Sequence, residues 1–131
     1  MSIRQREWEA RLRLQAFQVE EVRRQVGDIE LMIADFRNRQ KELETAIDYE
    51  EERAGIRDLK DVRYPLAAKE MRKRHANLGS SIADLQQQLE VAMERVRTEE
   101  AELERIREAA AREGVDAPMV PGMAPGMHPT L

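Results

Sequence analysis

The chain lacks cysteine, has only two histidines and carries five aromatic residues among its 131 positions. Without cysteine it forms no disulfide and no thiolate zinc site, and His75 and His128 are too far apart for a short two-histidine metal motif. So few aromatic side chains do not fill the thick core of an ordinary enzyme of this length. We therefore expect no catalytic activity and no cofactor.

The chain also lacks a long apolar run. Its first fourteen residues, MSIRQREWEARLRL, carry six charges where a signal peptide needs apolar side chains. No stretch approaches the ~20 apolar residues of a membrane-spanning helix. The net charge of −4 gives no general attraction for nucleic acid. The sequence predicts a soluble, cytoplasmic protein of one domain that binds no nucleic acid.

Proline is nearly absent before residue 114, since Pro65 alone precedes four prolines near the C-terminus. This shift in composition predicts a disordered tail over residues 114–131. The tail places Met119, Met123 and Met127 beside His128, and thioethers are possible ligands for Cu(I). Because the neighbouring prolines prevent these residues from forming one helical face, a flexible tail is favoured over a metal site.

The remaining sequence is rich in good helix formers and repeats every seven residues. Apolar residues fill eleven of fourteen alternating positions in the first half and eleven of thirteen in the second. The first set is Trp8, Leu12, Gln15, Val19, Val22, Val26, Ile29, Ile33, Phe36, Gln40, Leu43, Ile47, Glu50 and Ala54. The second set is Ala68, Met71, His75, Leu78, Ile82, Leu85, Leu89, Ala92, Val96, Glu99, Leu103, Ile106 and Ala110. This spacing is typical of a coiled-coil seam.

The stretch AGIRDLKDVRYP, residues 54–65, interrupts the repeat by placing Arg57 and Asp61 in the seam. Gly55 suits a helix C-terminus, and Pro65 suits a helix start. We therefore predict an all-α fold: a long two-helix antiparallel coiled-coil hairpin over 1–113, with helices over about 3–54 and 66–113 and a tip loop over 55–65. Because the heptads on either side of the loop stay in phase, one kinked helix in a parallel homodimer is the alternative.

Three further features bear on this hairpin. Gly79 follows Asn77 and Leu78 in a second possible break, but the repeat continues through it, so a continuous helix is expected. His75 lies in the seam opposite the region of Glu44 and can pair with that carboxylate. Acidic residues also stand four positions before basic ones on the outer faces, where i,i+4 ion pairs are expected. These pairs are Glu7/Arg11, Glu9/Arg13, Glu20/Arg24, Asp35/Arg39, Glu70/Arg74 and Glu108/Arg112.

Basic residues gather around the predicted tip. Residues 53–74 hold eight basic and three acidic side chains, a net charge of +5 in a chain whose total is −4. Such a tip can dock an acidic protein surface, although charged helix faces are commonly only solvated.

Three stretches resemble the FliJ family of flagellar type III export proteins, in forms similar to those of alphaproteobacteria. They are LRLQAFQVEEVRRQVGDIELMIADF, EEERAGI and YPLAAKEMRKRHANLGSSIADLQQQLE, which lie between residues 8 and 97. The resemblance implies an antiparallel hairpin similar to the stalk subunit of rotary ATPases, peripheral at the cytoplasmic face of the inner membrane. It also implies a stimulator of the export ATPase ring that engages the export gate and escorts export chaperones, and that is monomeric when free.

By the same resemblance, the open end of the hairpin meets the ATPase and the tip faces the export gate. The residues expected at the ATPase are Arg11, Arg13, Arg23, Arg24, Arg105 and Arg107. The residues expected at the gate are Tyr64, Pro65, Leu66, Arg72 and Arg74. The tail departs from the family pattern. A homodimeric coiled-coil scaffold or adaptor unrelated to export is the alternative function.

Overall fold

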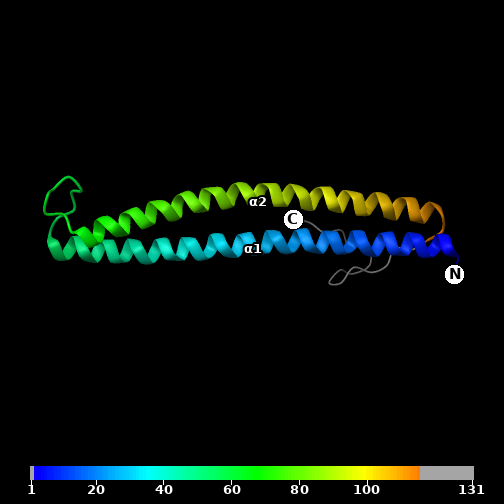
Figure 1. The fold of residues 1–131 in the computed structure, drawn as a ribbon, viewed down its shortest axis with the longest axis horizontal. Helices are drawn as coiled ribbons and strands as arrows, with labels where there is room; N and C mark the ends of the chain where they lie inside the picture. Colours follow the sequence, from blue (N-terminus) through cyan, green and yellow to red (C-terminus); the bar gives the residue numbers. More distant parts are fainter. Residues whose placement is uncertain (1, 116–131) are drawn as a thin grey trace. The chain divides into compact units, whose positions relative to one another are not determined.

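The structure, a computed structural model, describes residues 2–115 and forms a helical hairpin (Figure 1). Helix α1 spans Ile3–Ala54 and helix α2 spans Leu66–Arg112, and no strand occurs within the described residues. The predicted all-α hairpin is confirmed, with helix bounds at or within one residue of those expected. Neither helix offers a stretch long and apolar enough to cross a membrane. The predictions for residues 116–131, including Met119, Met123, Met127 and His128, lie outside the described residues.

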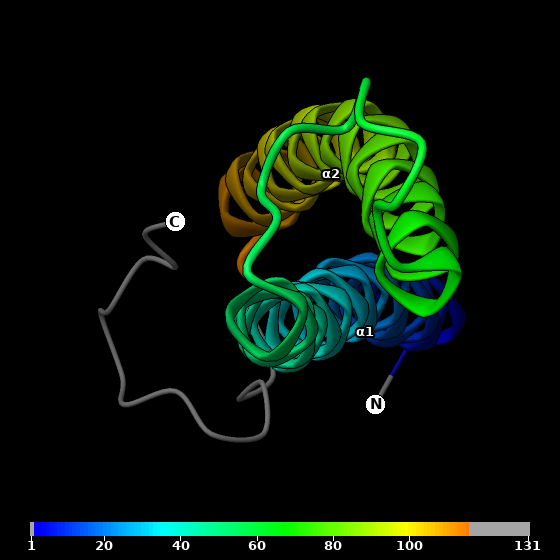
Figure 2. The same cartoon turned by 90° about the vertical axis from the view of Figure 1, so that its left-hand side faces the viewer.

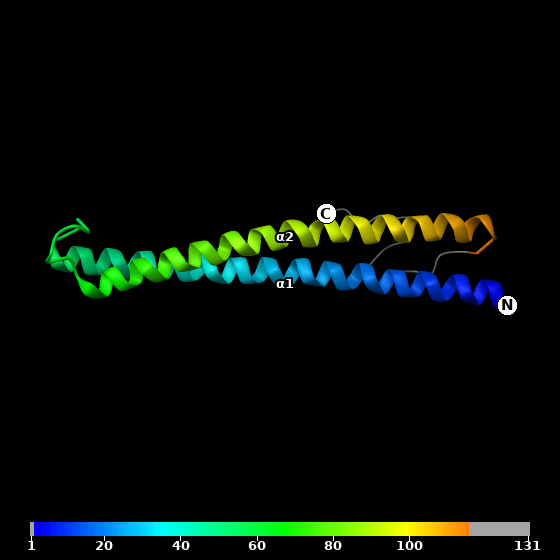
Figure 3. The same cartoon turned by 45° about the horizontal axis from the view of Figure 1, so that its top comes forward.

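Each helix runs through two compact units. In the described chain, unit 1 comprises residues 2–27 and 90–115, and unit 2 comprises residues 28–89. In unit 1 the first part of α1, in blue, lies beside the last part of α2, in orange (Figures 1 and 3). In unit 2 the loop in green joins α1 to α2 and brings the chain back on itself (Figure 2). The kinked single helix of the alternative fold is therefore absent from the described chain.

Each end of α1 carries a local signal, one that starts the helix and one that stops it. At its start the Ser2 Oγ accepts from the Gln5 amide at 3.1 Å while Gln5 Oε1 accepts from the Ser2 amide at 2.9 Å, a reciprocal capping box. At its end Gly55 has a φ of 69°, and the Ile56 amide donates back to the Glu51 carbonyl at 3.3 Å. This is the Schellman motif that a glycine in the left-handed region permits.

Helix α2 begins after Pro65, whose carbonyl accepts from the Lys69 amide at 3.1 Å. Pro65 therefore caps the helix instead of entering its first turn. The other end repeats the Schellman motif: Gly114 has a φ of 79°, and the Val115 amide donates to the Ala110 carbonyl at 2.9 Å. The helix continues through Gly79, as the sequence predicts.

The predicted seam forms the core of both units. In unit 1 the buried cluster contains Leu12, Val19, Leu103, Ile106, Ala110 and Val115, with Trp8 and Ala16 packed against it. In unit 2 the cluster contains Ile33, Ile82 and Leu85, with Ile29, Phe36 and Leu89 packed against it. Among the seam positions only Ala54 is exposed, because α1 ends there. Val115 lies outside the heptad frame and is buried by the turn at Gly114.

Polar seam residues pair across the two helices. In unit 1 the Gln15 amide Nε2 donates to the Glu99 carbonyl at 3.0 Å and to its carboxylate at 2.6 Å. In unit 2 the His75 Nε2 lies 2.9 Å from Glu44 Oε1, so the pair that the heptad register allows does form. The Gln40 Nε2 donates to the His75 carbonyl at 3.3 Å. Because such bonds form in one alignment only, they fix the antiparallel register of each unit.

The outer faces differ from the expected pattern of ion pairs. Of the six i,i+4 pairs only Asp35–Arg39 forms, at 3.0 Å. Arg24 pairs with Glu21 instead of Glu20, and Arg11 stacks over the ring of Trp8 at 4.7 Å from its centroid. A salt bridge on an exposed helix face contributes too little to dictate its partner, so a neighbouring acid or ring can replace it.

Candidate functional site

The loop of residues 55–65 is held by two successive turns. The Asp58 carboxylate accepts from the Lys60 amide at 2.9 Å, and the Asp61 carboxylate accepts from the Arg63 amide at 2.9 Å. The Asp61 and Tyr64 amides donate to the carbonyls of Asp58 and Asp61 at 3.1 and 3.0 Å. An aspartate that bonds a backbone amide two residues on stabilises a tight turn. The loop therefore has a defined backbone course.

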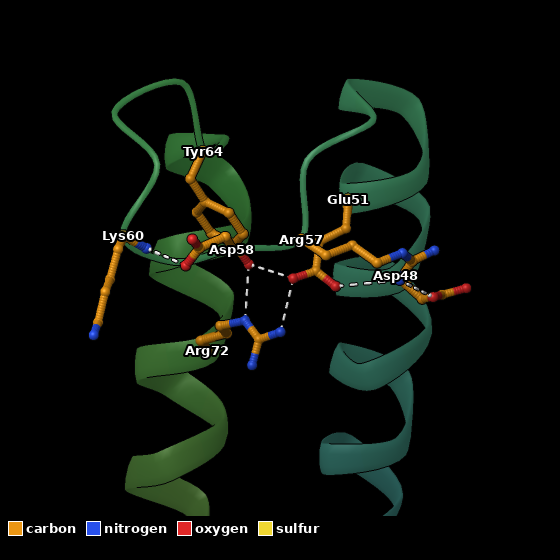
Figure 4. Close-up of polar contacts among 7 residues, drawn as sticks. All are labelled: Asp48, Glu51, Arg57, Asp58, Lys60, Tyr64 and Arg72. Carbon is orange, nitrogen blue, oxygen red and sulfur yellow. Dashed lines mark hydrogen bonds and ion pairs between the residues drawn. The ribbon is translucent and has the colours of Figure 1, made fainter.

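A cluster of three side chains ties this loop to both helices, and we call Glu51, Tyr64 and Arg72 the loop clasp (Figure 4). The Tyr64 hydroxyl donates to Glu51 Oε2 at 2.8 Å, and Arg72 donates to the same oxygen at 2.7 Å. Arg72 Nε also donates to the Tyr64 hydroxyl at 2.8 Å. Each member of the loop clasp thus contacts the other two.

The loop clasp sets the charge state of its members. Glu51 is only 5% exposed, yet the hydrogen bonds from Arg72 and Tyr64 lower the pKa of its carboxyl group. Burial raises the pKa of the Tyr64 hydroxyl, and the bond to Glu51 raises the pKa of Arg72. At neutral pH the clasp is therefore an anion held by one cation and one neutral donor.

Arg57 extends the network on the α1 side. Its guanidinium lies 2.9 Å from Asp48 and 3.5 Å from Glu51, and the bond to Asp48 raises the pKa of Arg57. The heptad position of Arg57 suggests a charge that destabilises the seam. Arg57 does not act in this way. It turns out of the seam to neutralise the end of α1.

The residues predicted at the tip fall into two groups. Tyr64 and Arg72 are engaged in the loop clasp, and Pro65 is half-buried as the cap of α2. Leu66 and Arg74 are exposed. Arg74 lines a groove of about 640 Å³ between the helices of unit 2. The other residues of this groove are Phe36, Arg39, Glu42, Leu43, Ala46, Asn77, Leu78 and Ser81.

The arginines predicted at the open end also differ in availability. Arg23 is half-buried between Glu20 and Glu100, with both ion pairs at 3.2 Å, and Arg107 lies half-buried beside Glu104 at 3.8 Å. Arg24 and Arg105 are exposed and pair with the acids three positions earlier. Arg13 is exposed and forms no ion pair with another described residue. Arg23 thus joins the two helices through Glu100 and Arg107 pairs within α2, while the others keep an exposed surface.

A second cluster, which the sequence did not reveal, joins the two helix ends in unit 1. Arg4 donates to both Glu113 oxygens, at 2.9 and 2.5 Å, and the Trp8 indole Nε1 donates to Glu113 Oε2. We call Arg4, Trp8 and Glu113 the terminal clasp. Its hydrogen bonds lower the pKa of the Glu113 carboxyl group to about 2. The capping turn at Gly114 places Glu113 there, and only the pairing of the helices reveals it.

Both clasps consist of hydrogen bonds among charged and aromatic side chains. Within residues 2–115 no group of three acidic or histidine side chains is arranged to hold a metal ion. Comparison with family models, with curated proteins and with solved structures finds no match to the chain. The resemblance to the FliJ family therefore rests on the three sequence stretches between residues 8 and 97.

Proposed function

We propose that this protein is the stalk-like coiled-coil partner of a flagellar type III export ATPase. In this proposal it stimulates the ATPase, engages the membrane export gate and escorts export chaperones at the cytoplasmic face of the inner membrane. The observation that supports the proposal is that one chain supplies both helices of the antiparallel pair. A single folded unit of two paired helices suits a stalk that enters an ATPase ring.

The open end supplies the surface for the ATPase in this proposal. Arg13 is free of ion pairs within the described chain, and Arg11 lies over Trp8, which the terminal clasp holds in place. Both cations can therefore meet acidic residues of a ring without first breaking an internal salt bridge. Charged groups of this kind contribute mainly to the association rate and to specificity.

ATP turnover tests the proposal. The full chain, added to the purified export ATPase of the same organism, is expected to raise turnover to a saturating level. An Arg11→Glu/Arg13→Glu variant should need at least about tenfold more protein for half-maximal stimulation, since reversed charges oppose an acidic partner. Arg37→Glu, an exposed arginine of α1 in unit 2, is the matched control and should stimulate as the wild type does. No rise in turnover at saturating protein contradicts the proposal.

The scaffold alternative has one observation in its favour. Leu14 and Phe17 are exposed three residues apart on α1 in unit 1, so they offer an apolar surface to a second copy. A homodimer would bury both side chains. The proposed stalk instead remains a monomer of 15.2 kDa, and its mass by light scattering at increasing concentration separates the two functions.

A further inference from the structure

The loop and the start of α2 expose apolar side chains that no described part of the chain covers. Val62 is 98% exposed, Leu59 is 52% exposed and Leu66, the first residue of α2, is 72% exposed. Three large apolar side chains are thus exposed within eight positions, a local concentration of the kind found at interaction surfaces. These side chains face solvent, and none of them lines the groove beside Arg74.

Lysines without acidic partners accompany these apolar side chains. Lys60 lies in the loop. Lys69 and Lys73 follow Leu66 in α2 at steps of three and four, so Leu66, Lys69 and Lys73 share one face of that helix. None of the three lysines forms an ion pair within the described residues. In Figure 4 the Lys60 side chain extends on the side of the loop away from Glu51. These cations are therefore available to an external anionic surface.

The two aspartates of the loop, Asp58 and Asp61, already accept hydrogen bonds from other loop residues. Asp58 accepts from the Lys60 amide, and Asp61 binds both the amide and the guanidinium of Arg63. The bonds from Arg63 lower the pKa of Asp61, so this carboxylate is charged but already neutralised. The loop clasp anchors the base of the loop on both helices. Since the backbone is ordered before any contact, little conformational entropy is lost on binding.

We propose that Leu59, Val62 and Leu66, with Lys60, Lys69 and Lys73, form a docking surface for an anionic phospholipid bilayer. The apolar side chains enter the boundary between headgroups and acyl chains, and the lysines contact the lipid phosphates above it. A bilayer accepts exposed apolar side chains without a preformed pocket, whereas a protein partner has to supply a matching surface. The proposal does not depend on an export ATPase.

Co-sedimentation with vesicles tests the proposal with the full chain. Vesicles of phosphatidylcholine with phosphatidylglycerol should bind the protein, pure phosphatidylcholine should not, and added salt should weaken the binding. Each basic residue at such a surface contributes about fivefold to binding. Lys69→Gln should therefore weaken binding about fivefold, and Lys69→Gln/Lys73→Gln about 25-fold. Lys41→Gln, an exposed lysine of α1, is the control and should leave binding unchanged.

The apolar contribution has its own matched pair. Leu66 and Leu31 are both 72% exposed and both lie in unit 2. Leu66→Asp should abolish vesicle binding, while Leu31→Asp should not affect it. An aspartate in the first turn of a helix is favourable, so Leu66→Asp leaves α2 intact, and circular dichroism verifies this.

Three results overturn the proposal. Absence of binding to anionic vesicles is the first, and equal binding losses for Leu66→Asp and Leu31→Asp are the second. The third is a wild type that ignores vesicles while Val62→Asp abolishes its binding to a protein partner, which would assign the surface to that partner.

Discussion

At the residue scale, the hydroxyl of Tyr64 joins the charged members of the loop clasp, because it donates to Glu51 and accepts from Arg72. Tyr64→Phe removes both bonds and should lower the free energy of unfolding by about 1–2 kcal/mol. Tyr49, the other tyrosine, is exposed, so Tyr49→Phe should change it by less than about 0.5 kcal/mol. Urea denaturation of the two variants measures the difference. Equal stabilities would show that the Tyr64 hydroxyl contributes nothing to the loop clasp.

Glu113 gives a pH dependence with a definite sign. Its pKa is lowered from 4.5 to about 2 in the folded chain, so the folded state binds the proton less tightly than the unfolded state. The stabilisation that the Glu113 carboxylate gives the folded chain is therefore complete above pH 4.5 and is lost as the pH falls from there to about 2. We expect Glu113→Gln to melt below the wild type at pH 7 and the two melting temperatures to converge by about pH 2. A constant gap across this range would contradict the terminal clasp.

The sequence predicted some of these residues and missed others for physical reasons. His75 and Glu44 could be paired because the seam positions and the register follow from the heptads. Glu51 lies one position outside the seam, so its burial was not predictable from periodicity. It is buried because the loop brings Tyr64 back over it, and the course of a loop depends on contacts that are distant in sequence.

At the scale of elements, Gly→Ala substitutions at three positions distinguish the effect of helix propensity from the effect of backbone geometry. Gly55 ends α1 with a φ of 69°, so Gly55→Ala should destabilise the chain by about 1 kcal/mol or more. Gly79 lies inside α2, and an added Cβ would meet the Gln40 Nε2 at 3.4 Å, an ordinary contact. Gly79→Ala should therefore stabilise the chain by about 0.5–1 kcal/mol.

Gly27 is the control for this comparison. It lies inside α1 where an added Cβ would meet no atom within 4 Å, so Gly27→Ala should stabilise the chain about as much as Gly79→Ala. Chemical denaturation of the three variants measures the order. If Gly79→Ala destabilised the chain while Gly27→Ala stabilised it, the packing of Gln40 against Gly79 would be tighter than described.

Elements were the most predictable level of the structure. Heptads, Gly55 and Pro65 are local signals, and they sufficed to place both helices and the reversal between them. The second Schellman motif at Gly114 was less evident, because its tight turn depends on Val115 entering the core. Salt bridges were the least predictable, since many weak alternatives compete on an exposed helix face.

At the scale of the whole molecule, the chain pairs two of its own helices, and both proposals use that pairing. The open end in unit 1 gathers arginines from α1 and α2, and the loop in unit 2 gathers apolar and basic residues from the loop and α2. A function could be proposed only through the FliJ resemblance, because heptads and charged outer faces are common to many coiled coils.

The most direct test of the antiparallel pairing is a distance between two spin labels in one chain. Because the protein has no cysteine, labels can be attached at Gln18→Cys and Thr98→Cys, two exposed positions in unit 1. Helices packed side by side predict a separation under about 40 Å that persists when labelled protein is diluted with unlabelled chain. A continuous helix in a parallel dimer would separate the labels of one chain by about 120 Å. Loss of the short distance on dilution, or its absence, would contradict the hairpin.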